Sequence, residues 1–77
     1  MHKPSITKAQ FDQIKEGMSR NEVTAIVGDP GQVQFETGTG KAYGALYSYW
    51  GDGSANSIAT MLFQAGILIK KHERNLQ

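Results

Sequence analysis

Two helix-start signals of the same kind stand close together near the beginning of the chain, and they constrain the fold more than any other feature. Thr7 is followed three residues later by Gln10, and Ser19 is followed three residues later by Glu22. In such a capping box the hydroxyl accepts a hydrogen bond from the third helical amide, and the side chain at that third position bonds back to the amide of the capping residue. The sequence therefore predicts two helices that begin at these positions.

The residues around the two starts give each predicted helix one apolar face. Ile6 can reach Phe11 and Met18 can reach Val23, a contact that fixes the angle at which the chain enters each helix. The apolar faces repeat at helical spacing; they comprise Phe11, Ile14 and Met18 in the first helix and Val23, Ile26 and Val27 in the second.

Glycine and proline indicate where the two helices end. Gly17 can adopt the left-handed conformation that terminates the first helix, and Gly28 can do the same for the second. Pro30 prevents continuation, because it lacks an amide hydrogen and clashes with the preceding turn. We expect a helix, a tight corner and a shorter helix.

After Pro30 the hydrophobic period changes from helical to two, which is typical of half-buried strands. Turn residues divide this part of the chain, and the short connections favour an antiparallel meander. The predicted strands cover residues 32–36, 43–50, 58–64 and 67–71, with turns at residues 38–41, 51–54 and 65–66. The sequence thus predicts an α+β fold of two layers, a helix-loop-helix packed on a four-stranded antiparallel sheet in the order α-α-β-β-β-β.

Length and composition restrict what this fold can do. Seventy-seven residues predict one domain, residues 1–77, in which nearly every apolar side chain must enter one core. The absence of cysteine excludes disulfides, thiolate metal sites and cysteine nucleophiles. A formal net charge of +1 argues against strong electrostatic capture of nucleic acid or a membrane surface.

Several apolar side chains that are not part of the predicted core fall on the second face of the sheet. The expected core comprises Phe11, Ile14, Met18, Val23, Ile26, Val27, Val33, Phe35, Met61, Phe63, Ile67 and Ile69. Ile58, Leu62 and Leu68 then lie on the uncovered face with one alternating set from residues 43–50. Two interpretations stay open: this face binds a partner, or it is covered internally, by the C-terminal residues 73–77 or by residues outside this sequence.

The helix-corner-helix residues also resemble a known family. Phe11 and Ile14, then Gly17-Met18-Ser19 with Glu22-Val23, closing in Val27-Gly28-Asp29-Pro30, resemble the SmpA/OmlA (BamE-like) small bacterial lipoproteins. The same pattern is similar to a repeat of the secreted β-lactamase inhibitory protein. The aromatic residues 47–50 and the 63–67 hairpin match the strands of these relatives, so that the likeness covers about residues 6–73.

This resemblance implies a non-catalytic domain that works outside the cytoplasm through protein contacts. It also implies membrane attachment only through an N-terminal lipid anchor, and the chain shows neither a lipidated cysteine nor an export signal. The localisation expected on this basis is the cell envelope or the extracellular space.

The candidate motifs for catalysis, cofactor binding and metal binding each lack required residues. The motif at residues 38–41 resembles the end of a phosphate-binding loop, but the earlier glycine is Phe35 and the following hydroxyl residue is Ala42. Asp52, Ser54 and Asn56 alternate as in a calcium loop, without its later glycine and glutamate. His2 and His72 stand at opposite ends of the chain. We therefore expect no enzyme activity, no cofactor and no metal.

A helix-turn-helix reading would make the protein a nucleic-acid binder. The second helix would then read bases through Arg20, Asn21 and Thr24, and a small basic cluster at Lys70, Lys71 and Arg74 would contact phosphate. The low charge and the need for the second helix in the core disfavour this reading.

The hypothesis that remains is a protein-binding domain of the bacterial cell envelope, with a scaffold role; the alternative is an inhibitor of a secreted enzyme such as a β-lactamase. The proposed anchors are Tyr47, Tyr49 and Trp50, with Tyr43 at the rim, because tyrosine and tryptophan dominate binding energy at interfaces. Packing within the core or the sheet is the alternative role for each of them. Strand alternation places Tyr47 and Tyr49 on one face, and Leu46 and Trp50 on the other. Whichever pair the helices leave uncovered is expected to form the centre of the binding surface.

A homodimer is a further possibility, through the same residual apolar surface.

Overall fold

The computed structural model describes residues 3–51 and 56–76, and it has the predicted α+β architecture. Two helices precede four strands, with one short 3-10 helix between the first two strands. The elements are α1 (Lys8–Gln13), α2 (Arg20–Val27), β1 (Gln32–Thr37), η1 (Gly40–Ala42), β2 (Gly44–Trp50), β3 (Ile58–Gln64) and β4 (Ile67–Arg74).

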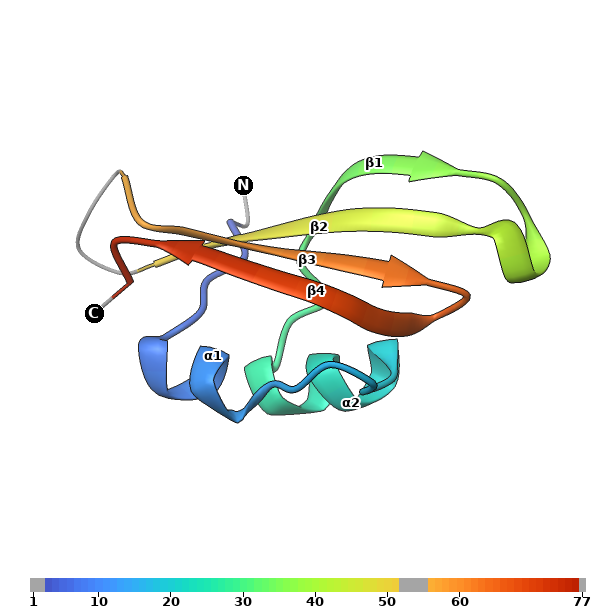
Figure 1. The fold of residues 1–77 in the computed structure, drawn as a ribbon. Helices are drawn as coiled ribbons and strands as arrows, with labels where there is room; N and C mark the ends of the chain where they lie inside the picture. The colour runs from blue at the N-terminus through green and yellow to red at the C-terminus, as the bar shows by residue number, and fades with distance from the viewer. Residues whose placement is uncertain (1–2, 52–55, 77) are drawn as a thin grey trace.

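The four strands form one antiparallel sheet in the order β1-β2-β3-β4, so each strand pairs with its neighbour in sequence. Both helices lie against the same face of this sheet (Figure 1). The other face, which we call the open face, therefore points away from the helical layer.

Both predicted capping boxes are present. The amide of Gln10 donates to Thr7 Oγ1 at 3.1 Å, and the amide of Thr7 donates to Gln10 Oε1 at 2.9 Å. Around Ser19 the two corresponding distances to Glu22 are 3.1 and 3.0 Å. Local side-chain chemistry thus sets both helix starts, as the spacing predicted.

We expect Ser19→Ala to destabilise the protein by about 1 kcal/mol, because the substitution removes the hydroxyl that satisfies a free amide of the first helical turn. Asn21→Ala, at an exposed position of the same turn, is the matched control and leaves stability nearly unchanged. Urea denaturation measures both variants, and an equal loss in the two would mean that the cap contributes nothing.

The end of α1 differs from the prediction. The sequence placed the end at Gly17, whereas α1 ends at Gln13 and Ile14 is already extended. Gly17 has a φ of +95°, and its amide donates to the carbonyl of Leu68 at 2.8 Å; the amide of Leu68 donates to the carbonyl of Met18 at 2.8 Å. The corner does not continue the helix, because its backbone pairs with the start of β4. The second prediction is confirmed, since Gly28 ends α2 in the left-handed conformation.

The N-terminal segment adds a short parallel pairing at the end of β2. The amide of Trp50 donates to the carbonyl of Pro4, and the amide of Ile6 donates to the carbonyl of Trp50, both at 2.9 Å. Ile6 itself is buried in the core. These two bonds fix the backbone of Trp50 on the side where β1 no longer accompanies β2.

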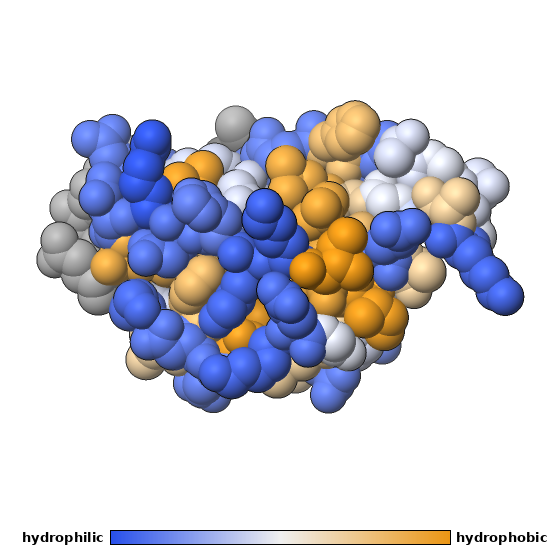
Figure 2. All heavy atoms as spheres, in the orientation of Figure 1, coloured by the Kyte–Doolittle hydropathy of each residue, from blue (hydrophilic) through white to orange (hydrophobic). Residues whose placement is uncertain are grey.

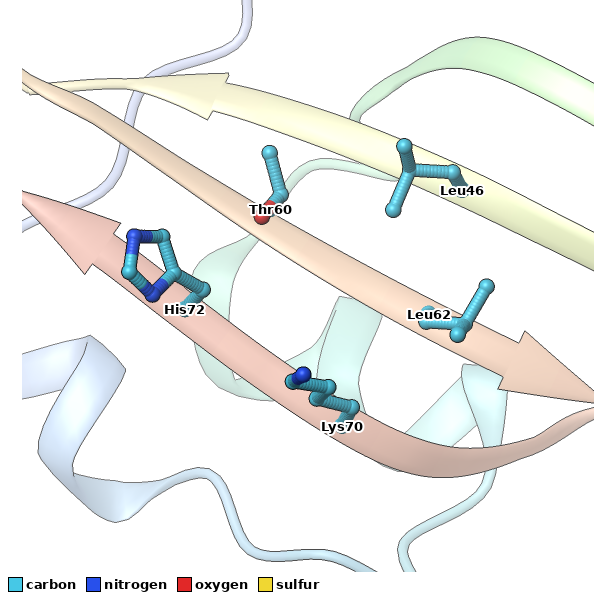
Figure 3. A pocket seen from close by; sticks show the side chains of 5 residues that line it. All are labelled: Leu46, Thr60, Leu62, Lys70 and His72. Carbon is cyan, nitrogen blue, oxygen red and sulfur yellow. The ribbon is translucent and has the colours of Figure 1, made fainter.

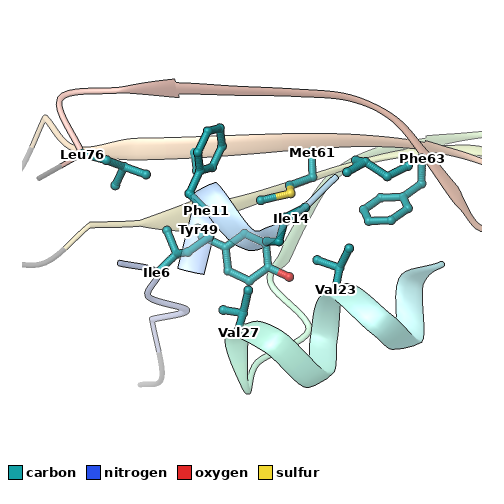
Figure 4. Close-up of a cluster of buried hydrophobic side chains, with 11 residues drawn as sticks. Ile6, Phe11, Ile14, Val23, Val27, Tyr49, Met61, Phe63 and Leu76 are labelled. Carbon is teal, nitrogen blue, oxygen red and sulfur yellow. The ribbon is translucent and has the colours of Figure 1, made fainter. Parts of the chain in front are cut away.

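The core lies between the helices and the sheet, with the ring of Tyr49 in its middle (Figure 4). The helices contribute Phe11, Val23 and Val27. The remaining buried members of the cluster are Ile6, Ile14, Tyr49, Ala59, Met61, Phe63, Leu68 and Leu76, with Met18, Ile26 and Tyr47 packed against them.

The core prediction for β1 is wrong. Val33 is 44% exposed and Phe35 is 56% exposed. Val33 pairs with Tyr47 and Phe35 pairs with the next residue, Leu46, so Gln34 is an extra residue in β1. This bulge breaks the strict alternation and turns Phe35 to the open face. The sequence pattern alone assumes regular alternation and places both side chains together.

The core prediction for β4 is wrong for a related reason. Leu68 is 1% exposed and enters the core, whereas Ile67 and Ile69 are 41% and 45% exposed. Leu68 pairs with Phe63, which faces the helices, and Ile69 is the extra residue of a second bulge before Lys70. The register of the β3–β4 hairpin therefore chooses Leu68 as the buried residue.

The C-terminal residues do not cover the open face in the described part of the chain. Leu76 is 8% exposed and belongs to the core cluster on the helical side. Its amide donates to a carboxylate oxygen of Glu73 at 3.0 Å, and the carbonyl of Asn75 accepts from the Ser57 hydroxyl at 2.8 Å. Of the two interpretations of the second sheet face, internal cover by this tail is wrong.

Candidate protein-binding face

The open face is built from four rungs of residues that run across the strands. Residues that pair directly across antiparallel strands point to the same side of the sheet. Ala45 and Tyr49 are buried in the core on the helical side, so Leu46, Ser48 and Trp50, which alternate with this side along β2, face away from the helices. The rungs are Thr37–Gly44–Gln64–Ile67, Phe35–Leu46–Leu62–Lys70, Gln32–Ser48–Thr60–His72 and Trp50–Ile58–Arg74.

One of these rungs forms an apolar stripe, which we define as Phe35, Leu46 and Leu62. Phe35 is largely exposed, and the two leucines are half-buried. Figure 2 shows a group of hydrophobic side chains at the molecular surface, with hydrophilic side chains beside it. The bulge in β1 creates the outer end of the stripe, because it turns Phe35 toward Leu46. Apolar side chains that gather on a surface in this way are typical of a protein interface.

A shallow hollow of about 260 Å³ lies beside the stripe on β2, β3 and β4. Leu46 and Leu62 form its apolar part, and Thr60, Lys70 and His72 form its polar part. Figure 3 shows these five side chains on the same side of the three strands. The hollow offers apolar contact next to a cationic group, which suits a side chain or loop of a partner better than a flat surface would.

Trp50 lies on the last rung, where backbone pairing and a neighbouring ammonium fix its position. Its backbone bonds to Pro4 and Ile6 on one side and pairs with Ile58 of β3 on the other, and the ammonium of Lys3 lies 5.2 Å from the centre of its ring. An ammonium at this distance from an indole is attracted by the electron density of the ring face. Trp50 is half-buried, so part of its ring remains available for contact.

The three tyrosines among the predicted binding residues lie on the helical side of the sheet, not on the open face. Tyr49 is fully buried, and its hydroxyl donates to the carbonyl of Asp29 at 3.1 Å. Burial raises the pKa of the Tyr49 phenol, since the charged form would lose its hydration. Tyr49 thus offers no surface to a partner. Tyr47 is half-buried, with the Arg20 guanidinium 3.8 Å from its ring centre and Phe63 edge-on at 5.8 Å.

Tyr43 lies at the edge of the same side. Its hydroxyl donates to a carboxylate oxygen of Glu36 at 2.6 Å. This hydrogen bond, followed by that with Tyr47, raises the pKa of Tyr43, because a proton that is donated to a carboxylate is harder to remove. Of the four predicted site residues, the structure therefore brings only Trp50 to the open face, together with Phe35 and the predicted alternative Leu46.

Two features of the open face had no clear signal in the sequence. Phe35 was assigned to the core because nothing in its neighbourhood marks the extra residue of the bulge. The hollow joins Lys70 and His72 to leucines from other strands, and only the sheet register brings them together. The two-residue spacing of Lys70 and His72 was a usable signal, since it predicts a shared face once a strand is assumed.

Two motifs in the sequence resemble a phosphate-binding loop and a calcium loop. Residues 38–41 lead through the 3-10 helix η1 into strand β2, so no α-helix N-terminus stands there to hold phosphate. Most of the calcium-like motif at Asp52, Ser54 and Asn56 lies outside the described residues. Within residues 3–51 and 56–76, no cluster of three or more metal-ligating side chains occurs. No helix in the described part of the chain is long and apolar enough to span a membrane.

Residues that a helix-turn-helix protein would use to contact DNA bond within this protein instead. Arg20 donates to the hydroxyl of Thr24 at 3.2 Å and stacks on Tyr47, so both helix residues are engaged within the protein. The basic cluster is divided between the two sides of the sheet: Lys70 and Arg74 lie on the open face, whereas Lys71 donates to the carbonyl of Phe11 at 2.8 Å. Burial at this position lowers the pKa of Lys71. These groups do not form a continuous track for phosphates.

Comparison with known proteins gives a family for this architecture. The family model described as Beta-lactamase inhibitor (BLIP) matches residues 3–77, nearly the whole chain. No curated protein matched the sequence. The description of the family is that of an inhibitor of β-lactamase, which is consistent with a protein-binding role. The likeness to the β-lactamase inhibitory protein is thereby confirmed, and the chain belongs to the β-lactamase inhibitor (BLIP) family.

Proposed function

We propose that this protein is an inhibitor that binds another protein through the open face of its sheet, with the apolar stripe and Trp50 at the centre. The observation that carries the proposal is the rung Phe35–Leu46–Leu62, which leaves a large aromatic and two leucines beside a hollow on the side away from both helices. Leu76 of the C-terminal segment packs in the core on the opposite side, so it does not occupy this surface.

The physical character of the surface suits a binding role. Residues at the centre of protein interfaces are mostly large side chains that become fully desolvated, surrounded by polar groups that exclude water. Trp50 and the apolar stripe supply the first kind, and Thr60, Lys70 and His72 supply the second. The strands that carry them are backed by the core, so little conformational entropy is lost when a partner binds.

The family match favours the inhibitor alternative over a scaffold role in the envelope. A secreted enzyme is then the natural target, and a β-lactamase is the first to test, which places the site of action outside the cytoplasm. The resemblance to the SmpA/OmlA lipoproteins, with a lipid anchor and a membrane complex, stays a prediction. Purified β-lactamases and a solubilised envelope extract distinguish the two partner types.

The direct test combines an inhibition assay with open-face variants. We expect the wild-type protein to inhibit at least one member of a panel of purified secreted β-lactamases, measured by hydrolysis of a chromogenic substrate. Leu46→Ala and Trp50→Ala should each weaken inhibition about 30-fold, the effect of losing about 2 kcal/mol at an interface centre. Thermal melting should show that both variants remain folded.

Val33→Ala is the matched control, because Val33 is also an exposed apolar residue of the sheet but lies on the helical side. It should leave inhibition unchanged. Equal weakening by Val33→Ala and Trp50→Ala would contradict the assignment of the open face. Lack of inhibition across the whole panel, with capture of a membrane complex from envelope extract instead, would contradict the inhibitor role and favour the scaffold.

A further inference from the structure

We infer that the open face selects a partner whose contact surface is acidic around an apolar projection. This inference rests on the proposed function and adds the chemistry of the partner to it. It follows from how the charged side chains divide between the two sides of the sheet, and from the position of the apolar stripe among them.

Two cationic groups, Lys70 and Arg74, form a row along the β4 edge of the open face, with the imidazole of His72 between them. Lys70, His72 and Arg74 alternate with residues of the other face, so the period of two places all three on the open side. Lys70 and His72 also line the hollow. Lys3 adds a further ammonium at the Trp50 end of the face.

The carboxylates lie elsewhere in the described part of the chain. Glu36 pairs with Ala45, and Glu73 pairs with Ala59, so both point to the helical side of the sheet. Glu36 accepts from the Tyr43 hydroxyl, and Glu73 accepts from the amide of Leu76. The other described acidic residues belong to the helical layer and its loops; they are Asp12, Glu16, Glu22 and Asp29.

This separation leaves the positive charges of the open face without acidic neighbours on the same face among the described residues. Lys71 shows the contrast, because it shares β4 with the cationic row but points to the other side and donates to the carbonyl of Phe11. The chain is nearly neutral as a whole, with a net charge of +1, yet one face is consistently positive. A partner with negative charge at this face is attracted, and one with positive charge is repelled.

The apolar stripe argues for a protein partner rather than nucleic acid or a bilayer. Phe35, Leu46 and Leu62 lie between the β1 edge and the cationic row, where a phosphate backbone would find no charge to pair with. The hollow beside the stripe accepts a projecting side chain, which a protein loop presents and a flat lipid surface does not. An acidic loop with an apolar tip satisfies both features at once.

The inference is tested by selecting partners without prior choice of sequence. A library of short cyclic peptides displayed on phage is panned against the wild-type protein. Binders that need the open face are recognised by loss of binding to Leu46→Ala and Trp50→Ala. We expect their sequences to be enriched in Asp and Glu around one or two large apolar residues, compared with the unselected library.

The charge variants then test the cause. For one selected peptide, the double variant Lys70→Glu and Arg74→Glu should lower the association rate about tenfold at low salt, and the difference should shrink as salt is added. Lys15→Glu is the control for the sign change, because Lys15 is an exposed residue of the helical layer. It should leave the rate nearly unchanged.

The outcomes separate this inference from the function on which it rests. Peptides that require Leu46 and Trp50 but show no acidic enrichment, or bind the charge-reversed variant equally fast, contradict the charge selection and leave the binding face intact. An absence of peptides that depend on Leu46 and Trp50 contradicts the binding face itself. Binding of phosphatidylserine vesicles or of an oligonucleotide that is lost in the charge-reversed variant would show that the row serves a different class of ligand.

Discussion

Tyr49→Ala should lower the free energy of unfolding by about 3–5 kcal/mol, the range measured for removal of large buried aromatics. The side chain is fully buried in the middle of the core, and its removal leaves a cavity between α2 and the sheet. It also leaves the carbonyl of Asp29 without the phenol that donates to it. Because a chain of this size has only about 4–12 kcal/mol of stability in total, the variant should be close to unfolding.

Tyr49→Phe separates the two contributions, since it keeps the ring and removes only the hydroxyl. We expect it to lower the free energy of unfolding by about 1 kcal/mol, the usual net contribution of one hydrogen bond. Tyr47→Ala is the second comparison, because Tyr47 is only half-buried at the border of the same core. Urea denaturation measures all three variants, and a loss at Tyr47 as large as that at Tyr49 would mean that the core centre is misplaced.

Gly31→Ala should destabilise the protein by about 3 kcal/mol, the sum of backbone strain and overpacking. Gly31 has a φ of +83°, where any other residue is strained. A methyl group at this position would also lie 2.7 Å from the ring of Tyr49. That ring cannot move aside, because it is enclosed by the core and its hydroxyl is bonded to Asp29.

Gly28→Ala is a closely matched control, because Gly28 has a φ of +81° but open space where the methyl group would lie. It should show the backbone strain alone, about 1–2 kcal/mol. The difference between the two variants in thermal or urea unfolding then measures the collision with Tyr49. If both glycines give the same loss, the turn after α2 can shift, and Gly31 does not hold the ring in place.

The starts of the helices could be predicted because the interactions that define them are local. Each capping box joins residues three positions apart, and both boxes form as the sequence indicated. Gly28 ends α2 for an equally local reason, since it needs no tertiary contact to adopt the left-handed conformation. The hairpin at Ala65 and Gly66 is of the same kind, as both residues have positive φ.

The end of α1 could not be predicted in the same way. A local rule places it at Gly17, but α1 ends at Gln13. In the corner that follows, the amide of Gly17 and the carbonyl of Met18 both bond to Leu68, about fifty positions later in the sequence. Buried backbone groups must find partners, and here the edge of β4 supplied them. Only the folded chain brings that edge to the corner.

The sequence by itself determined the order of elements, the two-layer architecture and the alternation that separates Tyr47 and Tyr49 from Leu46 and Trp50, because capping and strand periodicity act between near neighbours. The tertiary structure decided which pair the helices cover, and it buried Tyr49. It also decided the bulge at Gln34, which turned Phe35 to the open face, and the hairpin register that pairs Leu68 with Phe63 in the core. A bulge depends on the register between two strands, and that register is set by packing of the whole sheet against the helices, which no single segment encodes.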